Sequence, residues 1–180
     1  MTTSLDQFIS CVLTAWPDGA ERAAEATRSA LAELTGADAS EPWLAELLAE
    51  RPASRELHRD PAYGFMLLAH SENAGLYRPP HDHGRAWVVY AVQSGDLEIG
   101  TYRRIELADG EVGIAEQDRS MLRPGEARVY RVGDIHDTRC VSENAILFRF
   151  TERDLRREDL VEGKVTRFAM RDGRWTAARR

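Results

Sequence analysis

The N-terminal part of the chain places apolar side chains at the spacing of amphipathic helices. The first stripe recurs at i, i+3, i+4 and i+7 and consists of Leu5, Phe8, Ile9, Val12, Leu13 and Trp16. Ser4 and, three residues later, Gln7 carry the signature of a capping box at its start. The turn formed by Pro17–Gly19 predicts where this helix ends.

Two further helices are predicted before the character of the sequence changes. An alanine-rich run indicates a helix over residues 20–34 that stops before Gly36, and Ser40 can cap a third helix that ends before Pro52. The apolar face of the third helix would be Trp43, Leu44, Leu47 and Leu48. Such stripes usually pack against a neighbouring domain. We therefore interpret residues 1–52 as a helical segment packed on that domain rather than as a cofactor site.

Beyond Tyr63 the pattern changes to short β-rich runs separated by glycine, proline, asparagine and aspartate. The runs are Phe65–Ala69, Ala86–Gln93, Leu97–Ile105, Glu111–Leu122, Ala127–Tyr130 and Ala145–Thr151. Strands at this spacing predict a mainly β sandwich or barrel, which we place at residues 53–152. Residues 153–180 would form an extension, in which a turn at Arg171–Gly173 predicts a closing hairpin.

Length and charge narrow the classes of function. A chain of 180 residues suits one domain with a real core. The net charge of -6 argues against nucleic acid or an anionic membrane as the main partner. The first residues lack a charged-then-apolar leader and no long apolar run follows, so we expect a soluble, cytoplasmic protein. Cys11 and Cys140 are then expected to be reduced.

Two short histidine motifs carry the candidate chemistry. His81 and His83 are separated by one residue, so on an extended strand both point to the same face, and Asp82 points away. His136 arrives from a distant strand after a Gly-Asp turn. Three imidazole nitrogens can bind one metal ion and leave coordination positions open, which indicates chemistry. We interpret the two lone histidines, His58 and His70, as surface or hydrogen-bonded residues.

These motifs resemble the cupin superfamily. Its first motif places a glycine before two histidines and ends on a second glycine, positions occupied here by Gly75, His81, His83 and Gly95. In its second motif Gly125, Gly133 and His136 fall in register, whereas Arg131 replaces a proline and Cys140 an asparagine. The resemblance covers residues 55–151 and implies a double-stranded β-helix, or jelly-roll barrel.

One departure from the cupin pattern indicates a branch of the superfamily. The glutamate that usually completes the first motif would fall at Val88 or Trp87, neither of which binds metal. A site with three histidines and no glutamate resembles the thiol dioxygenases, including cysteine dioxygenase, and a bacterial subset described as metal-dependent double-stranded β-helix enzymes. Imidazole binds iron, nickel, zinc and copper alike, and manganese is a further alternative, so the ligand type does not identify the metal. The assignment of Fe(II) is what the resemblance implies.

The same comparison identifies candidate substrate-binding residues. The Ser-x-His-x-Tyr triad of cysteine dioxygenase is replaced by Leu147, Arg149 and Thr151. If Arg149 faces the barrel interior, its guanidinium can bind a carboxylate in bidentate fashion; the alternative is an outward arginine paired with a surface acid. Arg55 lies near the family's substrate-carboxylate arginine, with solvation as its alternative. Tyr102 and Trp87 could line the pocket or fill the core.

The resemblance therefore implies an Fe(II)-dependent dioxygenase of a small anionic substrate. Thiols of the cysteine or mercaptocarboxylate type are the favoured class, with dioxygen as the second substrate. Two alternatives stay open. The first is another three-histidine enzyme, such as a C–C-cleaving dioxygenase of dicarbonyls, an isomerase or a lyase. The second is a non-catalytic metal- or ligand-binding barrel. Exposed barrel edges are compatible with a homodimer.

Overall fold

The computed structural model describes residues 2–107 and 110–178, so the first residue of the predicted helical segment and the last two of the predicted extension lie outside it. The helices are α1 (Ser4–Ala15), α2 (Ala20–Leu34), α3 (Pro42–Glu50) and α4 (Leu155–Leu160). The strands are β1 (Arg55–Arg59), β2 (Met66–Asn73), β3 (Tyr77–His81), β4 (Val88–Ser94), β5 (Leu97–Glu106), β6 (Val112–Leu122), β7 (Ala127–Tyr130), β8 (Ile135–Cys140), β9 (Asn144–Thr151), β10 (Phe168–Arg171) and β11 (Arg174–Ala177).

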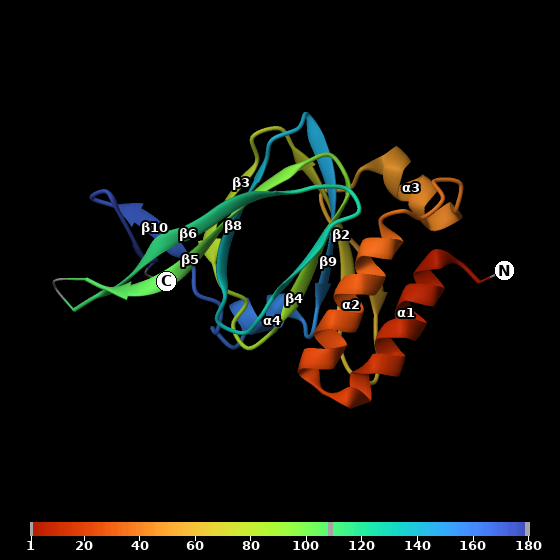
Figure 1. Cartoon of the computed structure of the whole chain (residues 1–180), viewed down its shortest axis with the longest axis horizontal. Helices are drawn as coiled ribbons and strands as arrows, with labels where there is room; N and C mark the ends of the chain where they lie inside the picture. The colour runs from red at the N-terminus through yellow and green to blue at the C-terminus, as the bar shows by residue number, and fades with distance from the viewer. Residues whose placement is uncertain (1, 108–109, 179–180) are drawn as a thin grey trace.

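The strands form two facing antiparallel sheets that enclose the barrel (Figure 1). One sheet has the order β1-β2-β9-β4-β7, and the other has the order β10-β11-β6-β5-β8-β3. Apart from the hairpins β1-β2, β5-β6 and β10-β11, neighbours in each sheet are distant in sequence, as in a jelly roll, where the chain crosses repeatedly between the sheets. The predicted mainly β fold, a double-stranded β-helix or jelly-roll barrel with a small N-terminal helical segment, is confirmed.

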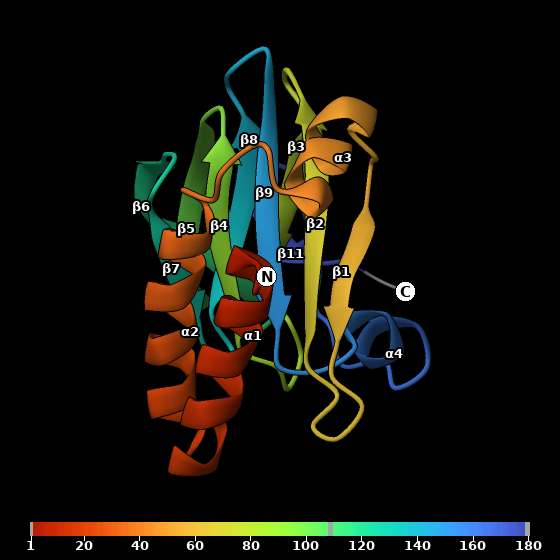
Figure 2. The same ribbon diagram turned by 90° about the vertical axis from the view of Figure 1, so that its right-hand side faces the viewer.

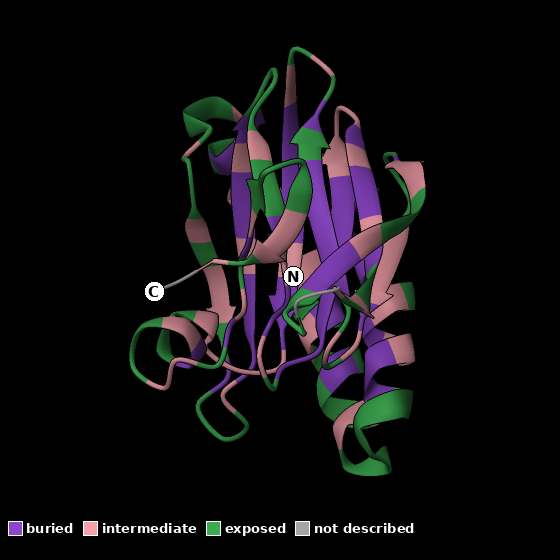
Figure 3. Ribbon diagram, turned by 90° about the vertical axis from the view of Figure 1, so that its left-hand side faces the viewer, coloured by how far each residue is buried: buried purple, intermediate pink, exposed green. Residues whose placement is uncertain are grey.

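The helices α1 and α2 cover the outer face of the first sheet (Figure 2). Phe148 and Phe150 of β9 point outward to these helices, and Trp87 stacks on Phe150 with ring centroids 5.2 Å apart. The alternate residues of β9 and β4, among them Leu147 and Tyr90, point into the barrel. Both faces of this sheet are therefore buried, and Figure 3 shows the buried residues concentrated in the middle of the strands.

The boundaries of several elements differ from the sequence prediction. The cap of α1 is Thr3, whose capping box is completed by Asp6, one residue before the predicted Ser4 and Gln7. Helix α3 begins after Glu41 with no side-chain cap bond, so the predicted Ser40 cap is wrong. Strand β1 and helix α4 were not predicted, and strands β3 and β8 were implied only by the histidine motifs, without bounds.

The predicted C-terminal hairpin is confirmed. Strands β10 and β11 pair antiparallel, and Asp172 and Gly173 between them have φ angles of 48° and 75°. These positive values are what a two-residue hairpin turn requires. The two cysteines are free, with Cys11 exposed on α1 and Cys140 buried on β8. Within the described ranges, none of the helices is both long and apolar enough to cross a membrane.

Candidate metal centre

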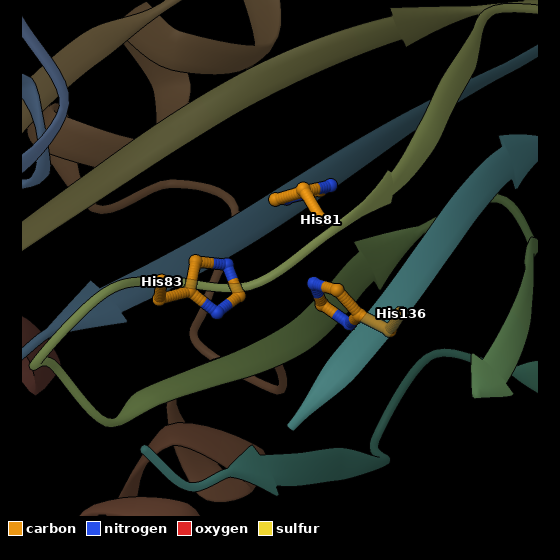
Figure 4. A group of neighbouring side chains, drawn as sticks. All are labelled: His81, His83 and His136. Carbon is orange, nitrogen blue, oxygen red and sulfur yellow. The ribbon is translucent and has the colours of Figure 1, made fainter. Parts of the chain in front are cut away.

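Three histidines converge inside the barrel. Figure 4 shows the side chains of His81, His83 and His136 turned toward a common point. Their ring centroids lie 5.1 Å (His81 to His83), 5.0 Å (His81 to His136) and 4.9 Å (His83 to His136) apart. One nitrogen of each ring can be chosen so that all three atoms lie within 4.8 Å of one another. The structure thus brings together the three residues that the sequence predicts as metal ligands.

Local backbone features deliver these side chains. Strand β3 ends at His81 and contains Pro79–Pro80, which cannot donate to a strand ladder and therefore suit its place at the edge of the sheet. His83 lies in the loop that follows, rather than on the strand itself. His136 is the direct cross-strand partner of His81 on β8. A loop and two paired strands therefore supply the three rings.

Burial keeps the three imidazoles neutral. It lowers the pKa of His81, and it holds the pKa of His83 and of His136 well below the ordinary value, with a smaller contribution from the neighbouring histidines. The Nδ1 of His81 donates to the Pro79 carbonyl at 2.9 Å, which leaves Nε2 with its lone pair free. Neutral imidazole is the form that coordinates a metal.

Several of these nitrogens are buried without a partner. Among the described residues, Nδ1 of His83 and both ring nitrogens of His136 make no hydrogen bond, although His136 is 0% exposed. An unsatisfied buried polar group costs about 1–3 kcal/mol. A bound cation would satisfy these nitrogens, so the donor set fits a divalent metal.

The geometry also fits such an ion. Metal–imidazole bonds of about 2.1 Å in a tetrahedral arrangement place two nitrogens about 3.4 Å apart. No two of the chosen nitrogens are more than 4.8 Å apart, so closure around an ion would need a movement of about 1.4 Å at most. In the part of the chain that the structure describes, the cluster contains no carboxylate. Asp82 is engaged elsewhere, with Oδ1 accepting from the Gly84 amide and Oδ2 from Arg104.

The opposite wall of the barrel presents two tyrosines to the histidines. The ring of Tyr130 lies 3.8 Å from that of His136, and the ring of Tyr90 lies 4.9 Å from it. The hydroxyl of Tyr90 is 3.4 Å from Nε2 of His83, whereas the buried hydroxyl of Tyr130 has no partner among the described residues. Burial raises the pKa of both phenols, so they are neutral and able to donate.

Arg149 faces this interior. It is the cross-strand partner of Tyr90, and it shares the inward phase of Leu147 on β9. Its charge lowers the pKa of all three histidines, which places it in their field. Its buried Nε has no acceptor, and no ion pair of Arg149 occurs within the described residues. It also lines a cavity of about 400 Å³ with Met66 and Leu68.

The other three predicted substrate-binding residues are not brought to the histidines. Arg55 pairs with Glu50 and Glu46 at α3, on the helical side of the sheet. Trp87 packs against the helices as a core residue. Tyr102 lies on the face of β5 opposite to its neighbour Thr101, the cross-strand partner of His136. Its hydroxyl donates to Asp137 at 2.6 Å.

Sequence reasoning missed two inward-facing residues, Tyr90 and Tyr130, which were not singled out. His70, interpreted as a surface or hydrogen-bonded histidine, is buried and its ring is hydrogen-bonded to the backbone of Ala53. Burial lowers its pKa to about 3. The sequence did contain an indication for Tyr90. It lies two residues from both Val88 and Val92 and therefore faces the same side of the strand, whereas Val89 and Ala91 face the helices.

Comparisons with known proteins add little beyond the fold. No protein-family model matches the chain, and no curated protein matches it. Among solved structures, KdgF from Halomonas sp. is 19% identical over 56% of this chain and 78% of its own, with a TM-score of 0.44. The DMSP lyase DddQ from Ruegeria pomeroyi DSS-3 is 20% identical over 63% of this chain and 50% of its own, with a TM-score of 0.43. The Schizosaccharomyces pombe Cnp3 cupin domain is 10% identical over 61% of this chain and 70% of its own, with a TM-score of 0.45.

Likenesses at this level carry no argument about activity. The chain spans half of DddQ, and all three identities lie at or below 20%. The site must therefore be interpreted from its own geometry. What that geometry provides is a mainly β barrel whose interior holds three converging histidines.

Proposed function

We propose that the chain is a mononuclear Fe(II)-dependent dioxygenase that oxidises a small anionic thiol of the cysteine or mercaptocarboxylate type. The observation that carries this proposal is a three-histidine cluster without a carboxylate, facing an arginine whose Nε has no acceptor among the described residues. Three neutral imidazoles leave the full charge of a divalent cation uncompensated, which favours an anionic substrate.

The metal supplies the redox chemistry. Fe(II), which His81, His83 and His136 would hold, would supply electron transfer between a thiolate and dioxygen. In the overall reaction the thiolate R–S⁻ and O₂ give the sulfinate R–SO₂⁻. Both oxygen atoms end on sulfur, sulfur loses four electrons and dioxygen gains them, so no further reductant is needed.

The chain's own residues bind and orient the substrate. The Arg149 guanidinium would bind the substrate's carboxylate, since its fork of N–H donors matches a carboxylate and its Nε is free to donate. The neutral Tyr90 hydroxyl lies between this arginine and His83, where it can donate to an anionic atom of the substrate. The rings of Tyr90 and Tyr130 cover His136 and exclude water from that side.

Oxygen consumption by the reconstituted protein tests the proposal. The protein is loaded anaerobically with Fe(II) and mixed with oxygen and either thiol carboxylates or dicarbonyls. We expect uptake with the thiol panel and a sulfinate product, and no uptake in a His136→Ala variant. Oxygen uptake with dicarbonyls alone would show that the protein is a C–C-cleaving dioxygenase and not a thiol dioxygenase. If the protein binds iron but consumes no oxygen with either panel, the interpretation as a non-catalytic metal-binding barrel is favoured.

A further inference from the structure

The C-terminal segment folds back onto the end of β3 and the loop after it, which carry His81 and His83. We call residues 81–85 the ligand loop and residues 154–167 the strap. The strap leaves the barrel after β9, forms α4 at the lower end of the barrel (Figures 1 and 2) and returns along the edge of β3. There, His81 and Arg167 form an isolated antiparallel bridge.

Asp82 joins the ligand loop to the strap. Its backbone N–H donates to the Thr166 carbonyl at 3.0 Å, and its Oδ1 accepts from the Thr166 amide at 2.8 Å. The same Oδ1 accepts from the Gly84 amide at 3.1 Å, within the loop. Since Asp82 stands between His81 and His83, these bonds fix the backbone between two of the three rings.

Glu158 makes the second junction. Its side chain, 3% exposed, accepts from Arg85 through the backbone amide at 3.2 Å and through the guanidinium at 2.8 Å. A buried carboxylate is stable only when it is paired and hydrogen-bonded. The pairing therefore depends on the strap staying docked against Arg85, at the C-terminal end of the ligand loop.

Gly84 lets the strap approach this closely. Its φ is +63°, and a Cβ built there would lie 2.9 Å from Oε2 of Glu158 and 3.0 Å from Cβ of Lys164. It would also lie 3.2 Å from the Lys164 carbonyl carbon, which is backbone and cannot move without shifting the strap. Any side chain at this position pushes the strap away from the loop.

We propose that the strap positions the ligand loop for metal binding, so that docking of the strap and binding of the metal strengthen each other. Gly84 and Glu158 are positioning residues in this coupling. The inference rests on the proposed function only through the presence of a metal at the three histidines. It predicts that metal affinity depends on residues that never touch the ion.

The affinity of the apo protein for Co(II), followed by its visible absorption, tests the coupling. We expect Gly84→Ala to bind Co(II) about 10- to 100-fold more weakly, the range known for residues that support metal ligands. Gly125→Ala is the matched control, because Gly125 also has a positive φ of +86° and has nothing within 4 Å of its Cβ position. Equal affinities of the two variants overturn the inference.

A second measurement uses the wild-type protein. Lys164 is the single lysine of the sequence and lies in the strap, so a lysine-specific protease cuts only there. Because coupling is reciprocal, saturating Co(II) should slow cleavage at Lys164. The factor should equal the loss of Co(II) affinity that undocking of the strap causes. Cleavage by an arginine-specific protease at the bond after Arg22, an exposed residue of α2, followed at that bond by mass spectrometry, controls for global stabilisation.

The outcomes separate the two proposals. If the wild-type protein binds no Co(II), both fail. If it binds Co(II) at the histidines but metal leaves cleavage at Lys164 unchanged, the strap coupling alone is refuted. Should Gly84→Ala fail to fold, Glu158→Gln, which keeps the side-chain volume, takes its place beside the protease experiment. Unaltered Co(II) affinity in Glu158→Gln then counts against the coupling.

Discussion

Replacing Arg149 by methionine separates a substrate-binding role from a structural one. Methionine keeps most of the apolar stem and removes the guanidinium. Arg149 is partly buried, its Nε has no acceptor, and no carboxylate pairs with it among the described residues. Its removal therefore breaks no ion pair that stabilises the fold. We expect the melting temperature of the apo protein to stay the same or to rise by a few degrees, about 2–4 °C per kcal/mol.

The expected loss lies in anion binding. Hydrogen bonds to a charged group are worth about 1.5–3 kcal/mol net. At about 1.4 kcal/mol per factor of ten, Arg149→Met should weaken binding of a carboxylate by about 10- to 100-fold. The Tyr90 hydroxyl, which Arg149 adjoins, remains in place and supplies the residual affinity.

Two probes isolate this effect. The Co(II)-loaded protein is titrated with 3-mercaptopropionate and with ethanethiol, which has the same thiol and no carboxylate. Wild type should prefer the mercaptocarboxylate, and Arg149→Met should lose that preference while binding ethanethiol unchanged. Arg55→Met is the control, because Arg55 pairs with Glu50 and Glu46 at α3 and should leave the preference intact. If Arg149→Met discriminates as well as wild type does, the assigned role of Arg149 is wrong.

Three further predictions concern stability. Burial raises the pKa of Asp137, but hydrogen bonds from Arg119, Tyr102 and neighbouring donors outweigh it and hold the pKa below its ordinary value. Asp137 therefore stabilises the fold above about pH 4, and urea unfolding should show this contribution fading at lower pH and missing in Asp137→Asn. Phe150→Ala should lower the free energy of unfolding by about 3–5 kcal/mol without changing metal stoichiometry, because Phe150 packs against the helices outside the barrel. Gly95→Ala should prevent folding as judged by circular dichroism, since its Cβ would lie 2.2 Å from a backbone oxygen at a φ of +76°.

The sequence was most informative where residue type and spacing decide the outcome. The histidine pair and the distant His136 predicted the three rings that meet in the barrel, and with the glycines in register they carried the resemblance that implied a β-helix. The Asp-Gly turn at residues 172–173 likewise predicted the hairpin, because that dipeptide tolerates positive φ at both positions. In each case a local rule and the global fold agree.

The sequence was less informative where tertiary contacts decide. The direction of Arg149 could not be predicted because helices bury the outer face of β9, so both phases of the strand are apolar. Tyr102 faces away from the histidines since the pairing of β5 with β8, invisible in sequence, puts Thr101 opposite His136.

The histidine motifs implied strands β3 and β8, but the hydrophobic pattern alone does not find them. A pair of prolines disguises β3 as a loop, although an edge strand tolerates them. Strand β8 reads as polar because its buried residues include His136, Asp137 and Thr138. Asp137 is hydrogen-bonded and His136 is a candidate metal ligand, so both can be buried in the fold. A hydropathy pattern counts such residues as exposed.

The most direct test of the central claim is the metal stoichiometry of the protein after dialysis against limiting Fe(II) or Zn(II). The central claim is that three neutral histidine rings bind one cation without a carboxylate. We predict one ion per chain in the wild-type protein and none in the His81→Ala/His136→Ala variant, with both proteins folded. Equal metal content in the two proteins, or no metal in wild type, would contradict it.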